Sequence, residues 1–123
     1  MDEAVPFEMV GEIGVFRLSG RMRFDGAIEV VRSAIESGRA QGLAQMVVVT
    51  SGLVGFGPPP LGDRAYMSRQ LASACGTARV AMVARPELVD PEKFGVILAR
   101  SYGANVDVFH TEAEALAWFA QDQ

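Results

Sequence analysis

The sequence predicts an α/β fold: a mixed, mostly parallel five-stranded sheet with four helices, in the order ββαβαβαβα. Unbroken apolar runs at 46–50 and 78–84 are typical of strands that are covered on both faces. Segments whose apolar residues recur at helical spacing alternate with these strands. The chain also begins with two short β-prone runs joined by a turn of hairpin length, which predicts one antiparallel pair in an otherwise parallel sheet.

The first half of the chain predicts the hairpin, a helix and the central strand. The hairpin is expected to pair strands at 7–10 and 15–19 across the turn GEIG. A helix is predicted over 24–40, where apolar residues repeat at i, i+3, i+4 and i+7, and Gly42 is placed to end it. The run MVVVT at 46–50 predicts a strand in the middle of the sheet.

The next three elements are a helix, a strand and a second helix. The helix is predicted over 61–75 and the strand over 78–84. The sequence DPEKF then has the features of a helix start, because Asp90 can accept hydrogen bonds from amides of the first turn and Pro91 has no amide hydrogen to leave unpaired. This second helix is expected to continue to about Tyr102.

The end of the chain predicts a last strand and a last helix. The strand is expected at 105–110. Thr111 then begins the sequence TEAE, which predicts a capping box in which Thr111 and Glu114 bond each other's backbone amides. Trp118 and Phe119 fall on different sides of the helix that follows, so one of them is expected to be partly exposed.

Length, composition and charge exclude several classes of protein. With 123 residues, half of them hydrophobic, the chain is expected to form one domain over 1–123 with a continuous core. The 11 basic residues are scattered among 15 acidic ones and the net charge is −4, so we expect no nucleic-acid partner. The acidic start MDEAVPFE and the lack of a long apolar run predict no signal peptide, no membrane span and a cytoplasmic protein.

The cysteine and histidine content argues against a disulfide framework or a metal site. There is one cysteine, Cys75, and one histidine, His110. A Cys/His zinc cluster needs several such ligands, so we expect no metal and no cofactor. Cys75 lies on the apolar side of its predicted helix and is expected to be a core residue.

The sequence SGLVGFGPPPLGDR at 51–64 has the glycine content of a phosphate-binding loop but lacks the other features of one. Asp63 follows Gly62, where a P-loop has lysine, and Pro60 stands where a dinucleotide-binding loop has its third glycine. The three consecutive prolines also remove amide donors that an anion would use. The segment is therefore predicted to be a stiff, exposed connection between a strand and a helix.

Three parts of the sequence resemble a known family. VVVTSGLVGFGPPPLGDR leading into a helix, ARVAMVARPELVDPEKFG, and the closing ANVDVFHTEAEALAWFA are similar to the SpoIIAA-like, or STAS-like, family of small bacterial domains. That family is related to the anti-sigma factor antagonists and to the cytoplasmic domains of sulfate transporters. The resemblance spans nearly the whole chain and implies a STAS-like fold and a regulatory role without catalysis.

The resemblance also places the phosphoacceptor position of the anti-sigma antagonists on this chain. Their loop before the helix, which carries a phosphorylatable serine, matches residues 57–61, and proline occupies the acceptor position. Ser51 lies several residues earlier, at the end of a strand. We therefore expect no phosphoacceptor and no phosphorylation switch of the kind that the family uses.

The candidate ligand or partner surface gathers around the proline segment and the carboxyl ends of the strands, where parallel α/β sheets bind ligands. Its residues are Ser51, Phe56, Pro58, Pro59, Pro60, Asp63, Arg64 and Arg85.

Three functions are considered for this surface. The first is a non-enzymatic regulatory or protein-interaction module, expected to be a homodimer with an unknown protein partner. The second is a carrier of a small apolar ligand or lipid, favoured by the high apolar content. The third is a hydrolase that uses Ser51 or His110, and it lacks a second histidine or a paired catalytic group.

Overall fold

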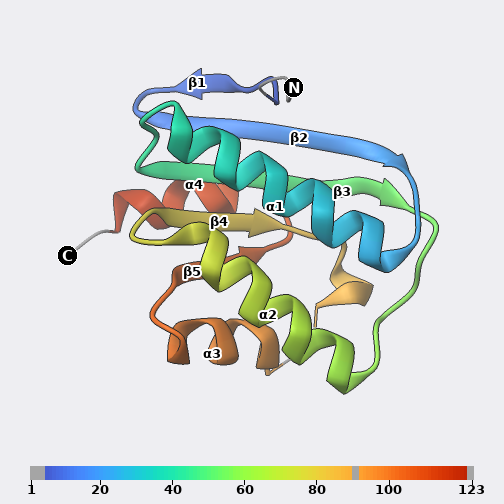
Figure 1. Cartoon of the computed structure of the whole chain (residues 1–123). Coiled ribbons are helices and arrows are strands. Elements are labelled where there is room, and N and C mark those ends of the chain that lie inside the picture. Colours follow the sequence, from blue (N-terminus) through green and yellow to red (C-terminus); the bar gives the residue numbers. More distant parts are fainter. Residues whose placement is uncertain (1–4, 90–91, 122–123) are drawn as a thin grey trace.

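The computed structural model describes residues 5–89 and 92–121, and its strands form one five-stranded sheet (Figure 1). The strands lie in sequential order across the sheet. The first pair is antiparallel and the other three pairs are parallel, as the sequence predicts. The strands are β1 Glu8–Val10, β2 Ile13–Arg21, β3 Gln45–Val54, β4 Arg79–Val83 and β5 Asn105–Phe109.

The helices divide unequally between the two faces of the sheet. Three of them, α1 Phe24–Ala40, α2 Leu61–Cys75 and α3 Phe94–Ser101, lie on one face, and α4 Glu112–Ala120 lies on the other (Figure 1). Right-handed crossovers between neighbouring strands taken in order place every connecting helix on the same side. Because α4 follows the last strand and connects no pair, it can cover the opposite face.

Alternate residues of the strands build two apolar layers. In β3, Met46 and Val48 point toward α1, α2 and α3, whereas Val47 and Val49 point toward α4. All four side chains are buried, which explains the unbroken apolar run of this central strand. The larger layer, on the side of the three helices, also contains Phe16.

The two long helices have the bounds that the sequence predicts, 24–40 and 61–75. Glycines with positive φ follow them and the third helix: Gly42 at 88°, Gly76 at 56° and Gly103 at 95°. Only glycine adopts such a backbone without strain, so these three positions end their helices.

The third helix is shorter than predicted. Helix α3 begins at Phe94, and Lys93 before it has a left-handed backbone with φ 54°. Asp90 and Pro91, the predicted start, lie outside the described residues. A short 3-10 turn, η1 Pro86–Leu88, precedes this region, with the amide of Leu88 donating to the Arg85 carbonyl at 2.9 Å. The chain therefore makes a separate turn before the helix starts.

The start of α4 follows the prediction in part. The amide of Glu114 donates to Thr111 Oγ1 at 3.1 Å, which confirms Thr111 as the cap. The Glu114 carboxylate accepts from the amide of His110 at 3.1 Å, one residue before the amide that a capping box uses. Phe119 is buried and Trp118 is half-buried, so one of the two is partly exposed as expected, but their rings lie 5.0 Å apart and both pack in the same apolar layer.

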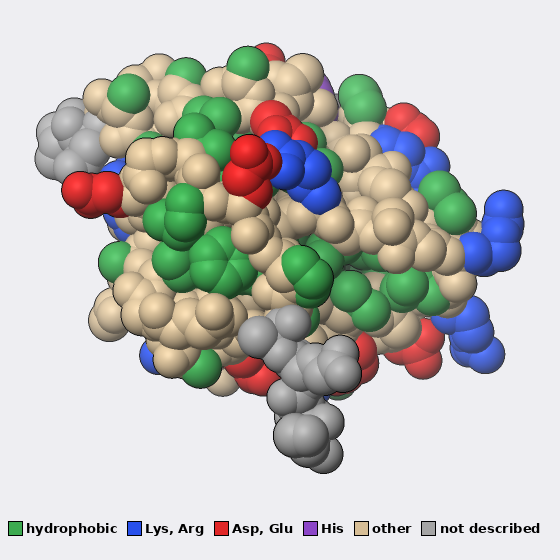
Figure 2. All heavy atoms as spheres, turned by 90° about the horizontal axis from the view of Figure 1, so that it is seen from above, with side chains coloured by type: hydrophobic (Ala, Val, Ile, Leu, Met, Phe, Trp, Pro, Cys, Tyr) green, Lys and Arg blue, Asp and Glu red, His purple; other side chains and the backbone are tan. Residues whose placement is uncertain are grey.

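The surface around the β1–β2 edge is chemically mixed. Figure 2 looks onto this edge and shows acidic and basic side chains next to each other, between separate groups of hydrophobic side chains. Within the described ranges, no helix has the length and apolar character needed to cross a bilayer. The same residues contain no group of three or more metal-binding side chains.

Candidate ligand pocket

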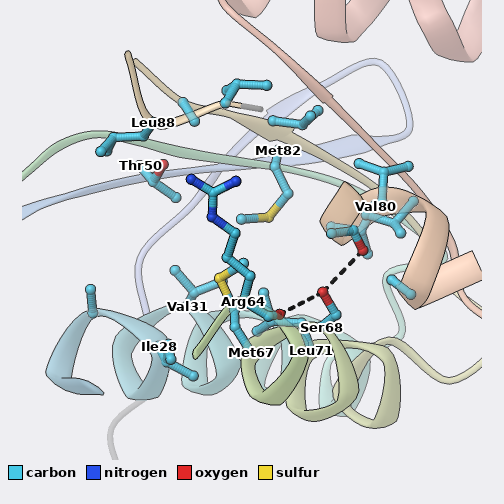
Figure 3. Close-up of a pocket in the computed structure, with 18 of the residues that line it drawn as sticks. Ile28, Val31, Thr50, Arg64, Met67, Ser68, Leu71, Val80, Met82 and Leu88 are labelled. Carbon is cyan, nitrogen blue, oxygen red and sulfur yellow. Dashed lines mark hydrogen bonds between the residues drawn. The ribbon is translucent and has the colours of Figure 1, made fainter. Parts of the chain in front are cut away.

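A pocket of about 180 Å³ lies between the sheet and the helices α1, α2 and α3 (Figure 3). Most of its wall is aliphatic or thioether side chain. Representative lining residues are Ile28 and Val31 from α1, Met67 and Leu71 from α2, Val80 and Met82 from β4, and Val96 from α3.

Small residues at inward positions leave the space for this pocket. Ala27 of α1, Ala72 of α2 and Ala99 of α3 are all buried and line it. Interiors normally pack to the density of organic crystals, so three helices that present methyl groups where larger side chains would fit leave a hollow. The pocket is therefore a product of the sequence of all three helices.

A serine fixes the two helices that form one wall. Ser68 of α2 is 2% exposed, and its Oγ lies 2.8 Å from the Arg64 carbonyl and 3.0 Å from the Gly95 carbonyl. A Cβ on Gly95 would lie 3.2 Å from this hydroxyl, so glycine permits the close approach. The hydroxyl lies within hydrogen-bond distance of one carbonyl from each helix. This contact holds α2 against α3, and the small serine side chain leaves the pocket open.

A bulge in β3 shapes the end of the pocket at the carboxyl ends of the strands. Arg17 pairs with Val49 but Ser19 pairs with Gly52, so β3 has one extra residue at this point. The extra residue reverses the alternation, and Leu53 is buried on the same side as Val48. Thr50 also lines the pocket there, and its Oγ1 donates to the Val83 carbonyl at 2.9 Å.

Arg64 enters the same end of the pocket from α2. Its side chain extends from α2 toward Thr50 and Met82, across the space between the helices and the sheet (Figure 3). Its Nε donates to the Pro59 carbonyl at 3.0 Å, which fixes the guanidinium against the proline segment. The group also has other interactions in the molecule. A positive, hydrogen-bonding group therefore stands at one end of an apolar space.

A charged group lies on the β5 side of the pocket. Asp107 lines it, and its carboxylate bonds Lys93 Nζ at 2.9 Å and Arg100 Nη2 at 3.2 Å. It also accepts from the amide of Val108 at 2.7 Å. Arg100 Nε donates in addition to the Val106 carbonyl at 3.0 Å. The negative charge of Asp107 is thus bound by two cations and a backbone amide.

The cysteine at the pocket is a core residue, as predicted. Cys75 is 1% exposed and lines the pocket wall. Burial raises the pKa of its thiol to about 11. A thiol held in its protonated form is a poor nucleophile, so the position favours packing over catalysis.

The eight predicted surface residues separate into three groups. Phe56, Pro59 and Arg64 line the pocket. Arg85 is half-buried, donates to the Leu53 carbonyl at 3.3 Å and pairs with Glu87 at 3.3 Å, so it supports the strand ends. The four that remain are exposed and lie outside the pocket lining: Ser51, Pro58, Pro60 and Asp63.

The geometry does not bring the proposed hydrolase groups together. Ser51 and His110 are both exposed. Within the described part of the chain, neither side chain makes a hydrogen bond to the other or to an acidic group. An activated serine needs its base within hydrogen-bond reach, so this structure gives no support to the third hypothesis.

Two solved structures with SpoIIAA-related descriptions align along nearly the whole chain. A candidate anti-sigma factor antagonist from Thermotoga maritima is 14% identical, with 95% of each chain covered and a TM-score of 0.50. An uncharacterised protein with a SpoIIAA-like fold from Shewanella loihica is 17% identical, with 94% of this chain and 91% of that chain covered and a TM-score of 0.51. This chain has the SpoIIAA-like fold.

The anti-sigma factor antagonist SpoIIAA in its unphosphorylated form is also similar, at 22% identity and a TM-score of 0.47, with 95% of this chain and 98% of that chain covered. No protein-family model and no curated protein matches the sequence. The Thermotoga maritima and Shewanella loihica structures establish the SpoIIAA-like fold of this chain and nothing beyond the fold.

Sequence reasoning missed most of the pocket wall in this SpoIIAA-like fold. Met67 and Met82 line the pocket, whereas Met9 of β1 is 48% exposed, and nothing in the sequence distinguishes these methionines from one another. The alanines on the inward faces of the three helices are the one feature of the sequence that indicates the pocket. That signal is weak, because alanine is among the residues most often buried in any protein interior.

Proposed function

We propose that the protein is a non-enzymatic binding module that holds a small, mainly apolar ligand between the sheet and helices α1, α2 and α3. The apolar pocket of about 180 Å³ carries this proposal. It is slightly larger than an engineered apolar cavity of about 150 Å³ that binds benzene. The second of the three functions considered above, the ligand carrier, therefore has the strongest support.

Elementary energetics favour such an occupant. A molecule that fills the pocket gains dispersion contacts with closely placed aliphatic walls and removes its own apolar surface from water. The size predicts a ligand of roughly six to ten non-hydrogen atoms inside the pocket, with room for a longer molecule only where it opens to solvent. Native mass spectrometry of protein purified without denaturation would detect a ligand retained from the cell.

The direct test uses 1-octanol as a neutral probe, titrated into protein labelled with ¹³C at its methyl groups. We expect chemical-shift changes concentrated on Ile28, Val31 and Leu71. The variant Ala72→Leu places a larger side chain at a buried lining position and should abolish binding. The matched control is Ser73→Leu, which introduces the same side chain at an exposed position of the same helix and should bind as the wild type does.

Two results would overturn the proposal. One is the absence of shift changes for these methyl groups at saturating 1-octanol. The other is equal binding by the wild type and a folded Ala72→Leu variant, since that would place the probe elsewhere.

A second candidate function is the protein-interaction module, which a separate observation favours. Leu61, directly after the proline segment, and Tyr66, in the second turn of α2, are 64% and 48% exposed. Exposed large apolar side chains of this kind are available for contact with a partner. The description of the Thermotoga maritima neighbour as a candidate anti-sigma factor antagonist is consistent with regulation through a protein partner.

Sedimentation equilibrium tests this second candidate through the predicted homodimer. Leu61→Ser should shift the association toward monomer if α2 forms the contact. Ile97→Ser removes a side chain that is 59% exposed on α3 and serves as the control. A wild-type protein that remains monomeric at all concentrations would contradict the homodimer.

A further inference from the structure

We infer that the ligand of this pocket is a small amphipathic carboxylate, with its apolar chain between the helices and the sheet and its carboxylate bound by Arg64 near Thr50. The inference rests on the proposed function and adds the chemical class and the orientation of the ligand. Three features of the described residues carry it: the polarity of one pocket end, the fixed position of Arg64, and the state of Asp107.

The pocket has different chemistry at its two ends. Around Ile28, Val31 and Leu71 the wall is aliphatic, whereas Arg64 and Thr50 meet at the end formed by the carboxyl ends of the strands (Figure 3). An entirely apolar ligand gains only apolar contacts in the pocket. A ligand with a single polar head can also form a charge-assisted hydrogen bond when the head lies beside Arg64.

Arg64 is suited to an oxygen acceptor with negative charge. Its guanidinium is planar and has five N–H donors, which match the two oxygens of a carboxylate in a fork arrangement. One donor, Nε–H, is used by the Pro59 carbonyl at 3.0 Å. That bond holds the side chain in place, so less conformational freedom is lost when a ligand binds. Because the guanidinium has several donors, Arg64 can bind the head group of a ligand and keep its other interactions.

The carboxylate of Asp107 does not prevent an anion from binding. It accepts from Lys93 at 2.9 Å, from Arg100 at 3.2 Å and from the amide of Val108 at 2.7 Å. Its negative charge is therefore already balanced by two cations on the β5 side of the pocket. A carboxylate suits this site because one fork-shaped donor group can bind both of its oxygens.

The experiment compares octanoate with 1-octanol, two probes that share a chain length and differ in the head group. Dissociation constants are measured by the same methyl NMR titration at low ionic strength. Wild-type protein should bind octanoate at least about tenfold more tightly than 1-octanol, the effect of a hydrogen bond to a charged group. Arg64→Met should remove this preference, and Arg64→Lys should restore part of it, because the charge returns without the fork.

The matched control is Arg69→Met, which removes an exposed positive charge from the same helix. It should keep the preference for octanoate, which separates a local contact from a general effect of charge. Binding of 1-octanol by Arg64→Met reports that the variant is folded and its pocket intact.

The outcomes distinguish the two proposals. If wild-type protein binds 1-octanol but prefers octanoate by less than about tenfold, or if Arg64→Met keeps the preference, the inference about the carboxylate is wrong and the apolar pocket stands. If neither probe binds the wild type, both the pocket function and this inference are overturned.

Discussion

Arg17 of β2 binds Glu112, the first residue of α4, through two hydrogen bonds, Nε to Oε2 at 2.8 Å and Nη2 to Oε1 at 2.9 Å. Its remaining terminal nitrogen, Nη1, donates to Glu8 of β1 at 2.7 Å. One guanidinium thus joins three elements on the face of the sheet that a single helix covers. The bonds from Arg17 lower the pKa of Glu112, and those to both carboxylates raise the pKa of Arg17.

This contact predicts a pH-dependent stability that Glu112→Gln should reduce. The folded pKa of Glu112 lies below its ordinary value of 4.5, so its contribution is present above pH 4.5 and is lost as the pH falls toward the lowered value. Because the pair is partly exposed, we expect the variant to melt only about 1–3 °C lower at pH 7. Calorimetry should show that this difference shrinks at pH 3, whereas a constant difference would contradict the linkage.

Replacing either of two glycines of α1 by alanine should change the stability of the fold, in opposite directions at the two positions. At Gly38 a Cβ would lie 2.5 Å from Met46 Sδ and 3.1 Å from Phe16 Cζ, so Gly38→Ala should destabilise the fold by about 1–3 kcal/mol. At Gly26 the nearest atom, Met22 Cβ, lies at an ordinary 3.5 Å, and Gly26→Ala should stabilise by about 0.5–1 kcal/mol through helix propensity. Urea unfolding of both variants checks the pair, and equal effects would show that packing at Gly38 is looser than described.

The buried thiol predicts a loss of stability at alkaline pH. The pKa of Cys75 is raised from 9.0 to about 11 in the folded protein, so the unfolded chain releases its proton first as the pH rises. The stability that depends on the protonated thiol is therefore full below pH 9 and declines between pH 9 and 11. Urea titrations across this range should show that the free energy of unfolding declines less steeply with pH for Cys75→Ala than for the wild type. The smaller side chain of the variant also lowers its stability, but by the same amount at every pH.

The cap of the last helix predicts a measurable loss for Thr111→Ala. The hydroxyl of Thr111 accepts from the amide of Glu114 at 3.1 Å, and caps of this type contribute about 1 kcal/mol. Thr77→Ala, an exposed position after α2, is the control and should be near neutral. A loss of the same size in both variants would argue against a specific capping role.

The parts of the fold that follow local rules were predictable from the sequence. The apolar spacing over 24–40 and 61–75, with a glycine after each segment, was sufficient to define α1 and α2. The β-branched run beginning at Met46 identified the central strand. The end of that strand was not predictable, because the bulge that carries it on to Val54 depends on pairing with β2 and leaves no local pattern.

The candidate site was predictable only where loop chemistry marked it. The proline segment drew attention to Phe56, Pro59 and Arg64, which do line the pocket. The hollow itself depends on how α1, α2 and α3 are placed relative to one another, and no single window of sequence contains that relationship. Ala27 and Ala99, for example, lie far apart in the chain and meet the same cavity.

Two side-chain bonds to the backbone of β5 also hinder the addition of a further strand at this edge of the sheet. Arg100 occupies the Val106 carbonyl and Asp107 occupies the Val108 amide, and β5 is an outer strand of the sheet. An incoming strand from another molecule would need backbone groups of this kind to extend the sheet. The opposite outer strand, β1, is only three residues long. Fibril growth by addition of strands is therefore disfavoured at both borders of the sheet.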